Sequence, residues 1–378
     1  MTDHIAILGA KGLPAKGGGE RVAEAIIKKA IKDGFRITLY GKKDYCRPVN
    51  YGPNFKMITI TEIKGKHLSA FSFGLLSALH ALMFGKYDLI HLHYADFGYI
   101  VPLLKLKFKV IATSHGAEYN RDKWGKLAKL FFRFVEGPFV KYSNICTSMS
   151  KRLSDYYSQK YKKKVYFIPN GADILQDVKF GCSANIKYNL PINDYMLFAA
   201  GRVISSKGCD LLLLANKNLN SEIPLVIIGG LEGDVGYKFY LESLSKPNIK
   251  FVNFIEKKED LFEIISNSKF FIFPSTYEAM SMMLLEVAFL KKGVVCSDIQ
   301  ENYDAIGNNA IFFKFGNYED LANKIDFALR NQSVMDELGQ KAYQYVKEKR
   351  NWEAITDYYI QLYKSLIKGY SIPINVVD

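Results

Sequence analysis

The sequence predicts an α/β protein with two doubly wound, parallel-sheet domains, and three observations support this fold class. At 378 residues the chain is too long for one ordinary hydrophobic core and has about the right length for two. Its strand-like runs are short and almost wholly apolar, which is typical of parallel strands covered by helices on both faces. Helical patterns separate most of these runs, so right-handed crossovers would build doubly wound sheets.

The strand-like runs occur in both halves of the chain. In the first half they are Ile5–Leu8, Ile37–Tyr40, Met57–Ile60, Leu89–Leu92, Val110–Thr113, Ile145–Thr147 and Val165–Ile168. In the second half they are Met196–Ala199, Leu225–Ile228, Ile249–Val252, Phe270–Phe273 and Val294–Ser297. Between them, Arg21–Lys32 has a helical pattern. The apolar stretch Leu68–Phe84 is interrupted by Ser, Gly and His, so we expect a buried helix there rather than a membrane span.

We place the boundary between the domains at Pro169-Asn170-Gly171, because proline ends the preceding strand and Asn-Gly forms a turn. The predicted domains are residues 1–170 and residues 171–351. The last helical stretch carries one Trp and three Tyr, and such a helix has to be buried. We therefore expect residues 352–378 to complete the first domain.

Charge differs strongly between the two halves. Residues 1–170 carry 29 Lys and Arg against 12 Asp and Glu, a net charge of +17, whereas the rest of the chain has a net charge of −4. The basic half favours an anionic membrane surface or a phosphorylated acceptor as a partner. Nucleic acid is not expected, since no recognition-helix, RNP or zinc-finger motif accompanies the charge.

The five cysteines are scattered through apolar runs, and their odd number and spacing argue against a disulfide framework and a zinc site. The first residues include Asp3 and His4 and lack the apolar run of a secretory leader. We therefore expect a cytoplasmic protein with reduced thiols.

The sharpest motif is a buried strand, a short loop and a helix within Phe270–Ala288. The loop carries Glu278, the helix is predicted to begin near Ser281, and Glu286 follows within it. The first amides of this helix, at Ser281, Met282 and Met283, would favour a bound phosphate. The two carboxylates would then hold hydroxyl groups on either side of that phosphate. The alternative is that Glu278 only complements the helix dipole and Glu286 is solvated.

A second motif, Gly201-Arg202 followed by Lys207-Gly208, comes directly after a predicted buried strand. Two cations five residues apart in a βα loop suit a diphosphate whose negative charge grows during a reaction. The alternative is that Arg202 and Lys207 are ordinary surface charges.

The loop Gly9–Glu20 contains three consecutive glycines, which include Gly17 and Gly18. Glycines of this kind allow a close approach of the backbone to a ligand and expose amide groups. The loop lacks both the dinucleotide-binding G-x-G-x-x-G register and the G-K-[ST] ending of a P-loop. A plain flexible turn is the alternative.

Three histidines lie at or near strand ends. His115 follows a predicted strand at the carboxyl edge, where ligands of open α/β sheets bind, although a lone histidine is commonly structural. We expect the rings of His91 and His93 to point to opposite faces of their strand, so that they form a poor metal chelate. No metal site is predicted.

The segment Trp124–Phe134 alternates large apolar residues with Lys126, Lys129 and Arg133. A helix of this composition is a candidate for contact with an anionic membrane surface. The alternative is a half-buried helix with a solvated basic face.

In this order the motifs resemble the retaining glycosyltransferases of family four, whose GT-B architecture has two Rossmann-like domains facing across a cleft. The resemblance rests on Gly17-Gly18-x-Glu20, Ile168-Pro-Asn-Gly-Ala-Asp173, Gly201-Arg202 with Lys207-Gly208, and Glu278-x7-Glu286. The opening loop and His115–Trp124 look most like bacterial rhamnosyltransferases, although Tyr119 and Ala279 stand where Trp and Gly are usual.

The resemblance implies roles for the motif residues. Arg202 and Lys207 would neutralise the diphosphate of a nucleotide-diphosphate-sugar donor, and Gly18 with the amides of Ser281–Met283 would complete the cradle. Glu286 would hold the ribose, Glu278 the donor sugar, and His115 would line the reacting face. Family members use no cofactor, and this sequence has no Asp-x-Asp motif for a divalent metal.

The resemblance therefore implies a metal-independent transferase of cell-surface polysaccharide synthesis. It would move rhamnose from dTDP-rhamnose, or a hexose from a UDP-sugar, to a saccharide or lipid-linked acceptor at the inner face of the plasma membrane. Two alternatives stay open. One is a sugar-nucleotide 2-epimerase of the same architecture, for which the Glu278–Glu286 spacing is a poor match. The other is an inactive nucleotide-sugar-binding subunit.

Overall fold

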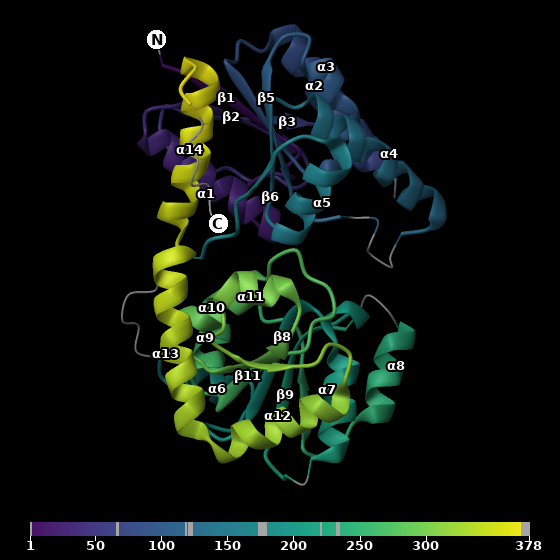
Figure 1. Ribbon diagram of the computed structural model, residues 1–378, viewed down its shortest axis with the longest axis vertical. Helices are drawn as coiled ribbons and strands as arrows, with labels where there is room; N and C mark the ends of the chain where they lie inside the picture. The colour runs from purple at the N-terminus through teal and green to yellow at the C-terminus, as the bar shows by residue number, and fades with distance from the viewer. Residues whose placement is uncertain are drawn as a thin grey trace. The chain divides into compact units, whose positions relative to one another are not determined.

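The computed structural model describes residues 2–65, 68–117, 119, 124–172, 180–219, 221–231 and 235–371. The chain divides into two compact units, unit 1 (Met1–Gly171 with Trp352–Asp378) and unit 2 (Ala172–Asn351). Each unit is an α/β domain with its own parallel sheet (Figure 1). Asp173 of the expected hinge, and Glu118 and residues 120–123 of the segment after His115, lie outside the described residues.

The sheet of unit 1 has seven parallel strands in the order β3-β2-β1-β4-β5-β6-β7. Their bounds are β1 His4–Leu8, β2 Arg36–Lys42, β3 Phe55–Ile60, β4 Leu89–His93, β5 Lys109–Ser114, β6 Ile145–Ser148 and β7 Val165–Phe167. The strand β1 lies between β2 and β4, with Ile5 in register with Ile37 on one side and Leu89 on the other. The chain therefore reverses its direction of travel across the sheet between β1 and β4.

Helices cover both faces of this sheet. They are α1 Gly18–Lys32, α2 Leu68–Phe84, α3 Val101–Leu104, α4 Lys126–Tyr142, α5 Lys151–Tyr161 and α14 Trp352–Lys368. One core contains buried residues of α1 and α14, such as Ile26 and Tyr359. The other contains buried residues of α2, α4 and α5, such as Phe73, Phe139 and Tyr157. The C-terminal helix α14 thus packs beside α1 within unit 1 (Figure 1).

Unit 2 has a six-stranded parallel sheet in the order β10-β9-β8-β11-β12-β13. Its strands are β8 Met196–Arg202, β9 Leu225–Gly230, β10 Ile249–Val252, β11 Phe270–Phe273, β12 Val294–Ser297 and β13 Ile311–Phe313. The strands β8 and β11 are neighbours, while the chain continues from β8 to β9 on one side and from β11 to β12 on the other. This sheet also has a point at which the strand order reverses.

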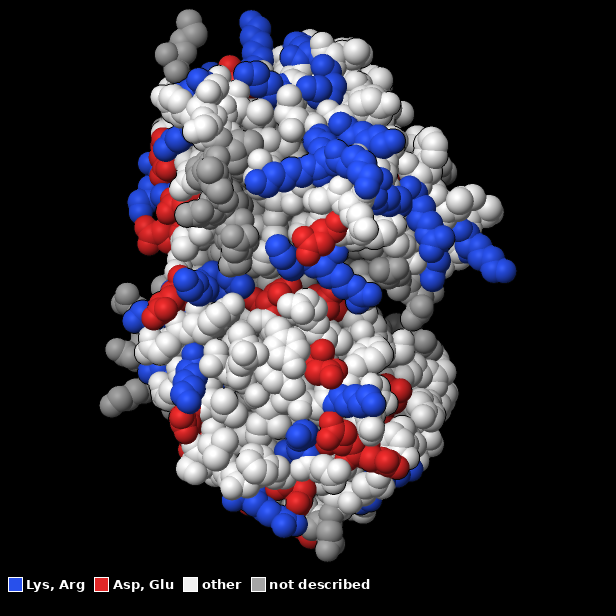
Figure 2. All heavy atoms as spheres, viewed as in Figure 1, with Lys and Arg blue, Asp and Glu red and all other residues white. Residues whose placement is uncertain are grey.

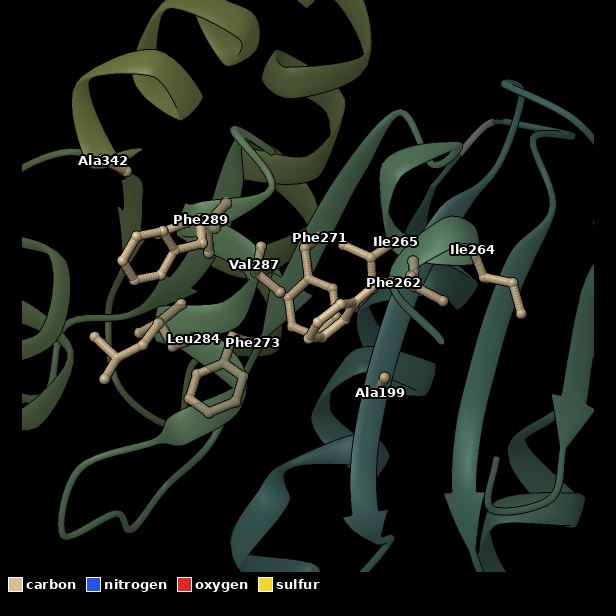
Figure 3. Packing of buried hydrophobic residues seen from close by; sticks show 14 of the residues in the cluster. Ala199, Phe262, Ile264, Ile265, Phe271, Phe273, Leu284, Val287, Phe289 and Ala342 are labelled. Atoms are coloured by element: carbon tan, nitrogen blue, oxygen red, sulfur yellow. The ribbon is translucent and has the colours of Figure 1, made fainter. Parts of the chain in front are cut away.

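The helices of unit 2 again divide between two faces. They are α6 Ser183–Lys187, α7 Cys209–Asn218, α8 Val235–Leu244, α9 Lys258–Ser266, α10 Met282–Phe289, α11 Gln300–Ile306, α12 Tyr318–Arg330 and α13 Gln332–Lys349. In one core, Phe262 of α9 and Val287 of α10 lie near the rings of Phe271 and Phe273 from β11 (Figure 3). The other core joins α7, α8 and α12 to the opposite face of the sheet.

The predicted fold class is confirmed, and each strand-like run of the sequence coincides with a strand of the structure. The prediction missed β13, which has only three residues, two of them half-buried, and is followed directly by Lys314. The helix predicted over Arg21–Lys32 begins three residues earlier, at Gly18.

The helix predicted over Leu68–Phe84 is confirmed, but the expectation that it is buried holds for only one of its sides. The helix α2 has these bounds, and Phe73 and Ala81 are buried on the sheet side. The opposite side is open, with Met83 and Phe84 exposed to 66% and 68%. The helix has large apolar residues on both its buried and its exposed side, and the sheet covers only the first.

Candidate functional site

Two loops meet at the carboxyl edge of the unit 2 sheet, at the point where the strand order reverses. One follows β8 and contains Lys207, and the other follows β11 and contains Glu278. Backbone hydrogen bonds join them, since the amides of Thr276 and Tyr277 donate to the carbonyl of Ser206 at 2.9 and 3.4 Å. Ligands of open α/β sheets bind in the crevice at such a reversal.

Gly208 makes the close approach of these two loops feasible. Its φ is +67°, and a Cβ added there would lie 2.0 Å from the carbonyl oxygen of Pro274. Both the left-handed conformation and the short distance exclude a side chain. Gly208 also precedes α7 directly, so Lys207 lies at the turn between β8 and that helix.

Lys207 and Glu278 form an ion pair across the two loops. The distance from Lys207 Nζ to Glu278 Oε1 is 2.5 Å, with the carboxylate side chain 8% exposed and the ammonium side chain 25% exposed. A carboxylate that is this deeply buried needs a compensating charge, because desolvation of an unpaired ion is costly. The pair places one negative and one positive group together at the end of the sheet.

The helix α10 begins as the sequence predicted. Ser281 is its N-cap, and the Ser281 side chain accepts a hydrogen bond from the amide of Leu284 at 3.4 Å. The amides of Met282 and Met283 belong to the first turn, where helix geometry provides no intrahelical acceptor. The start of α10 therefore presents donors and the positive end of a helix dipole three residues after Glu278.

Glu286 lies in α10 and is buried, so the alternative of a solvated carboxylate is wrong for this residue. Its Oε1 is 2.9 Å from Nζ of Lys258, the first residue of α9. Lys258 is not among the site residues predicted from the sequence. No local pattern marks it, because the contact joins helices that are separated by a strand and two loops.

The remaining predicted residues of unit 2, Gly201 and Arg202, form the last two positions of β8, and both are exposed. A Cβ added at Gly201 would meet no atom within 4 Å, so the protein itself does not require glycine there. Arg202 lies five residues before Lys207 at the same end of β8. The structure thus pairs each glutamate with its own lysine and leaves the arginine at the surface.

In unit 1 the glycine loop ends at the start of α1, with Gly17 as the N-cap and Gly18 as the first helical residue. A Cβ on Gly17 would lie 2.5 Å from Glu20 Oε2, and a Cβ on Gly19 would lie 2.0 Å from the hydroxyl of Tyr94. Packing against the Tyr94 ring therefore accounts for Gly19, whereas at Gly17 only the flexible end of the Glu20 side chain would have to move. This observation supports a structural role beside the ligand-binding role that the sequence suggested.

His115 lies beside this glycine loop. Its ring stacks on Tyr94, with centroids 4.3 Å apart, and a Cβ on Gly19 would lie 3.0 Å from its Nδ1. The His93 ring forms a hydrogen bond with the His115 ring, and His93 Nδ1 lies 2.9 Å from His115 Nε2. His115 is therefore held in position from two directions at the carboxyl edge of the unit 1 sheet.

The expectation that His91 and His93 point to opposite faces is wrong. Residues two apart on a strand share a face, and the two ring centroids are 4.3 Å apart. His91 is held by the hydroxyls of Tyr363, at 2.6 Å, and Thr113, at 2.7 Å. In the described part of the chain no group of three or more His, Cys, Asp or Glu is placed to hold a metal ion.

Burial lowers the pKa of His93 to about 3, and it lowers the pKa of His91 well below its ordinary value, with the charges of His93 and His115 adding to the effect. Both rings are therefore neutral at pH 7. One ring nitrogen of a neutral imidazole donates and the other accepts, so the hydrogen bonds of His93 and His91 restrict which tautomers they adopt.

These shifts predict acid-sensitive stability of unit 1. An unfolded histidine takes up a proton near pH 6.5, whereas folded His93 remains neutral until about pH 3. The free energy of unfolding should therefore fall as the pH drops below 6.5, by up to about 1.4 kcal/mol per pH unit for each such histidine. Urea unfolding followed by tryptophan fluorescence would measure this, because both tryptophans, Trp124 and Trp352, belong to unit 1.

His93→Phe removes one titrating ring, so the pH slope of unfolding should become shallower even if the variant is less stable at pH 7. An unchanged slope would contradict the assignment of a neutral buried His93. His4→Phe is the control, since His4 is only partly buried in the same sheet and burial lowers its pKa less.

The segment after Trp124 forms α4, and its basic side chains contribute to a band of Lys and Arg on unit 1 (Figure 2). No helix in the described ranges combines the length and the apolar character that crossing a bilayer requires.

Two family models match the chain. The model described as Glycosyltransferase Family 4 matches residues 16–175, and the model described as Glycosyl transferases group 1 matches residues 184–345. The first match contains the three consecutive glycines at positions 17–19 and His115. The second contains Lys207, Lys258 and both glutamates.

The chain is also similar to individual proteins. An uncharacterised 41.2 kDa protein of the cps region of Klebsiella pneumoniae is 25% identical, over 81% of this chain and 87% of its own. An N,N'-diacetylbacillosaminyl-diphospho-undecaprenol alpha-1,3-N-acetylgalactosaminyltransferase of Campylobacter jejuni is 25% identical over 44% of each chain. The crystal structure of Anabaena HepE in complex with UDP-glucose superimposes with a TM-score of 0.75 at 14% identity, covering 97% of this chain and 100% of that chain. The last similarity shows the shared fold.

Proposed function

The chain belongs to the family 4, group 1 glycosyltransferases of GT-B fold, and from this membership we propose that it transfers a sugar, with retention of configuration, from a nucleotide-diphosphate donor to a lipid-linked saccharide. The observation that supports the proposal most directly is the Lys207–Glu278 ion pair at the strand-order reversal of unit 2. It provides a cation for a diphosphate and a carboxylate for sugar hydroxyls, side by side.

The proposed donor site consists of groups around this pair. Lys207, together with Arg202, would neutralise the negative charge that develops on the leaving diphosphate, and the first amides of α10, from Ser281 to Met283, would donate to it. Glu278 would accept hydrogen bonds from the donor sugar. Fixed positive groups of this kind stabilise the transition state without a metal ion, so we propose metal-independent transfer.

Glu286 is proposed to hold the ribose hydroxyls of the donor. Lys258 Nζ lies 2.9 Å from its carboxylate, so that a positive charge compensates the negative charge of this buried group. In unit 1, His115 and the loop at Gly17 and Gly18 are proposed to serve the reacting sugar. The hydrogen bond between the His93 and His115 rings and the stacked Tyr94 would hold the His115 ring in one orientation.

We propose that the donor is dTDP-rhamnose or a UDP-hexose, and that the product enters a capsular or O-antigen polysaccharide. The HepE structure contains UDP-glucose, and the names of two relatives contain a cps region and an undecaprenol-linked acceptor. Nucleotide sugars and the basic unit 1 together support a site of action in the cytoplasm, at the inner face of the plasma membrane.

The test is a donor panel with the purified full-length chain. Release of the nucleoside diphosphate is measured for dTDP-rhamnose, UDP-sugars and GDP-sugars, with and without a polyprenyl-diphosphate-linked saccharide. We expect one donor to give acceptor-dependent release, and NMR of the product to show the anomeric configuration of the donor. Inversion of that configuration would contradict the proposed mechanism. Conversion of the donor alone into an epimer would replace transfer by the isomerase alternative.

A further inference from the structure

The helix α2 presents an apolar side to its surroundings. No charged residue occurs anywhere in Leu68–Phe84. The large exposed side chains on it are Leu68, Phe71, Leu76, Leu79, Met83 and Phe84, with exposed fractions from 38% to 68%. Large contiguous apolar surfaces are uncommon on soluble proteins and mark sites of interaction.

The first half of α4 also exposes large apolar side chains, and it exposes them to a greater extent. Leu127, Leu130, Phe131 and Phe134 follow each other at helical spacings of three and four residues, so they form one stripe. In a surface helix such a stripe normally faces the core. Here it is exposed, with Leu127 at 85% and Phe134 at 72%, while the core of unit 1 is filled by residues from the second half, such as Phe139.

Ring contacts join the two helices into one surface. Phe71 of α2 lies 6.5 Å, centroid to centroid, from Phe131 of α4, and Tyr99 stacks on Phe71 at 4.7 Å. At the other end of α2, Lys107 Nζ donates to the carbonyl of Leu82 at 2.8 Å, beside Leu106, which is 81% exposed. We call the exposed apolar residues of α2 and α4, together with Leu106, the α2/α4 face.

The exposed charged residues in the first half of α4 are basic. In α4, Lys126 and Arg133 are exposed and Lys129 is partly exposed. Glu136, the single acidic residue of α4, is 1% exposed and is paired with Lys160 at 2.8 Å. It therefore contributes no negative charge to the surface. The apolar stripe of α4 thus carries positive charge along one of its flanks.

We propose that the α2/α4 face is a docking surface for an anionic lipid membrane. Apolar side chains flanked by Lys and Arg fit the interface of such a membrane, where the side chains enter the acyl region and the cations remain among the headgroups. A second copy of the chain fits less well, because a twofold contact would bring the same basic residues of both copies together. The inference extends the proposed function, since this surface would meet the lipid of the acceptor, but its test needs neither donor nor acceptor.

The experiment is cosedimentation of the full-length chain with vesicles. Vesicles of phosphatidylcholine mixed with phosphatidylglycerol are compared with vesicles of phosphatidylcholine alone, at low and high salt. We expect binding to the anionic vesicles, weakened by salt. Leu127→Asp with Leu130→Asp should weaken binding on the order of a hundredfold, because two exposed leucines no longer enter the membrane.

Two further variants separate the parts of the surface. Lys126→Glu with Arg133→Glu should weaken binding to anionic vesicles by on the order of tenfold or more and reduce its dependence on salt. Met83→Asp with Phe84→Asp tests the contribution of α2. All of these side chains are exposed, so the melting temperature should stay close to that of the wild type.

Matched controls are available in unit 2. Ile186→Asp with Phe239→Asp changes two leucine-sized or larger side chains that are 69% and 66% exposed, and it should leave vesicle binding unchanged. Equal loss in the controls, or full binding by the Leu127/Leu130 variant, would overturn the proposal. A different outcome would assign the face to a second copy of the chain. In that outcome the wild type binds neither kind of vesicle but forms a dimer, and the Leu127/Leu130 variant is monomeric.

Discussion

Lys207→Ala is expected to lower kcat for sugar transfer by about a hundredfold or more. The lysine is ion-paired with Glu278 at the proposed donor site. Removing a preformed charge that stabilises a leaving group acts on the transition state more than on the ground state. The measurement is the rate of acceptor-dependent release of the nucleoside diphosphate at saturating donor.

The control for this variant is Lys187→Ala. Lys187 is also ion-paired in unit 2, with Asp260 at 2.7 Å, but it belongs to α6 and to neither of the two loops. Its loss should leave kcat unchanged. Because Lys207→Ala removes the partner of a buried carboxylate, Lys207→Arg is made in parallel to keep the charge. A kcat near that of the wild type in Lys207→Ala would remove the lysine from the mechanism.

Glu278→Ala is expected to lower kcat/KM by one to two orders of magnitude, since a hydrogen bond to a charged group contributes about 1.5–3 kcal/mol. Glu278→Gln keeps the shape of the side chain and separates the effect of charge from that of size. For comparison, Glu286→Ala should act mainly through the KM for the donor, because the ribose contacts proposed for this residue would be the same in the ground and transition states.

Glu337→Ala is the matched control for the glutamate. Glu337 pairs with Lys341 at 2.6 Å on α13, a helix of the same unit, and the pair is exposed, so kinetic constants and melting temperature should both stay near wild-type values. If Glu278→Ala behaved in the same way as this control, the carboxylate at the strand-order reversal would have no part in transfer.

Much of the fold can be read from short-range features of the sequence. Strands such as Phe270–Phe273 are recognised because four consecutive large apolar residues suit a position buried on both faces. The start of α10 is recognised because Ser281 is a good N-cap and the residues after it are strong helix formers. Both signals depend only on neighbouring residues, so they can be recognised from the sequence alone.

The sequence did not predict features that depend on which other elements pack against a helix. Periodicity could not show that only one side of α2 meets the sheet, or that the apolar stripe of α4 stays exposed. It also did not reveal Lys258, which reaches Glu286 from another helix.

By itself, the sequence determined the fold class, the strands and the presence of the Glu278, Glu286, Arg202 and Lys207 motifs, because residue type and spacing along the chain carry this information. Only the tertiary structure decided which charges pair. Lys207 and Glu278 are 71 residues apart, and they meet because β8 and β11 are neighbours in the sheet and a glycine at position 208 lets their loops touch. Strand order arises from the packing of the whole sheet, so no local pattern contains it.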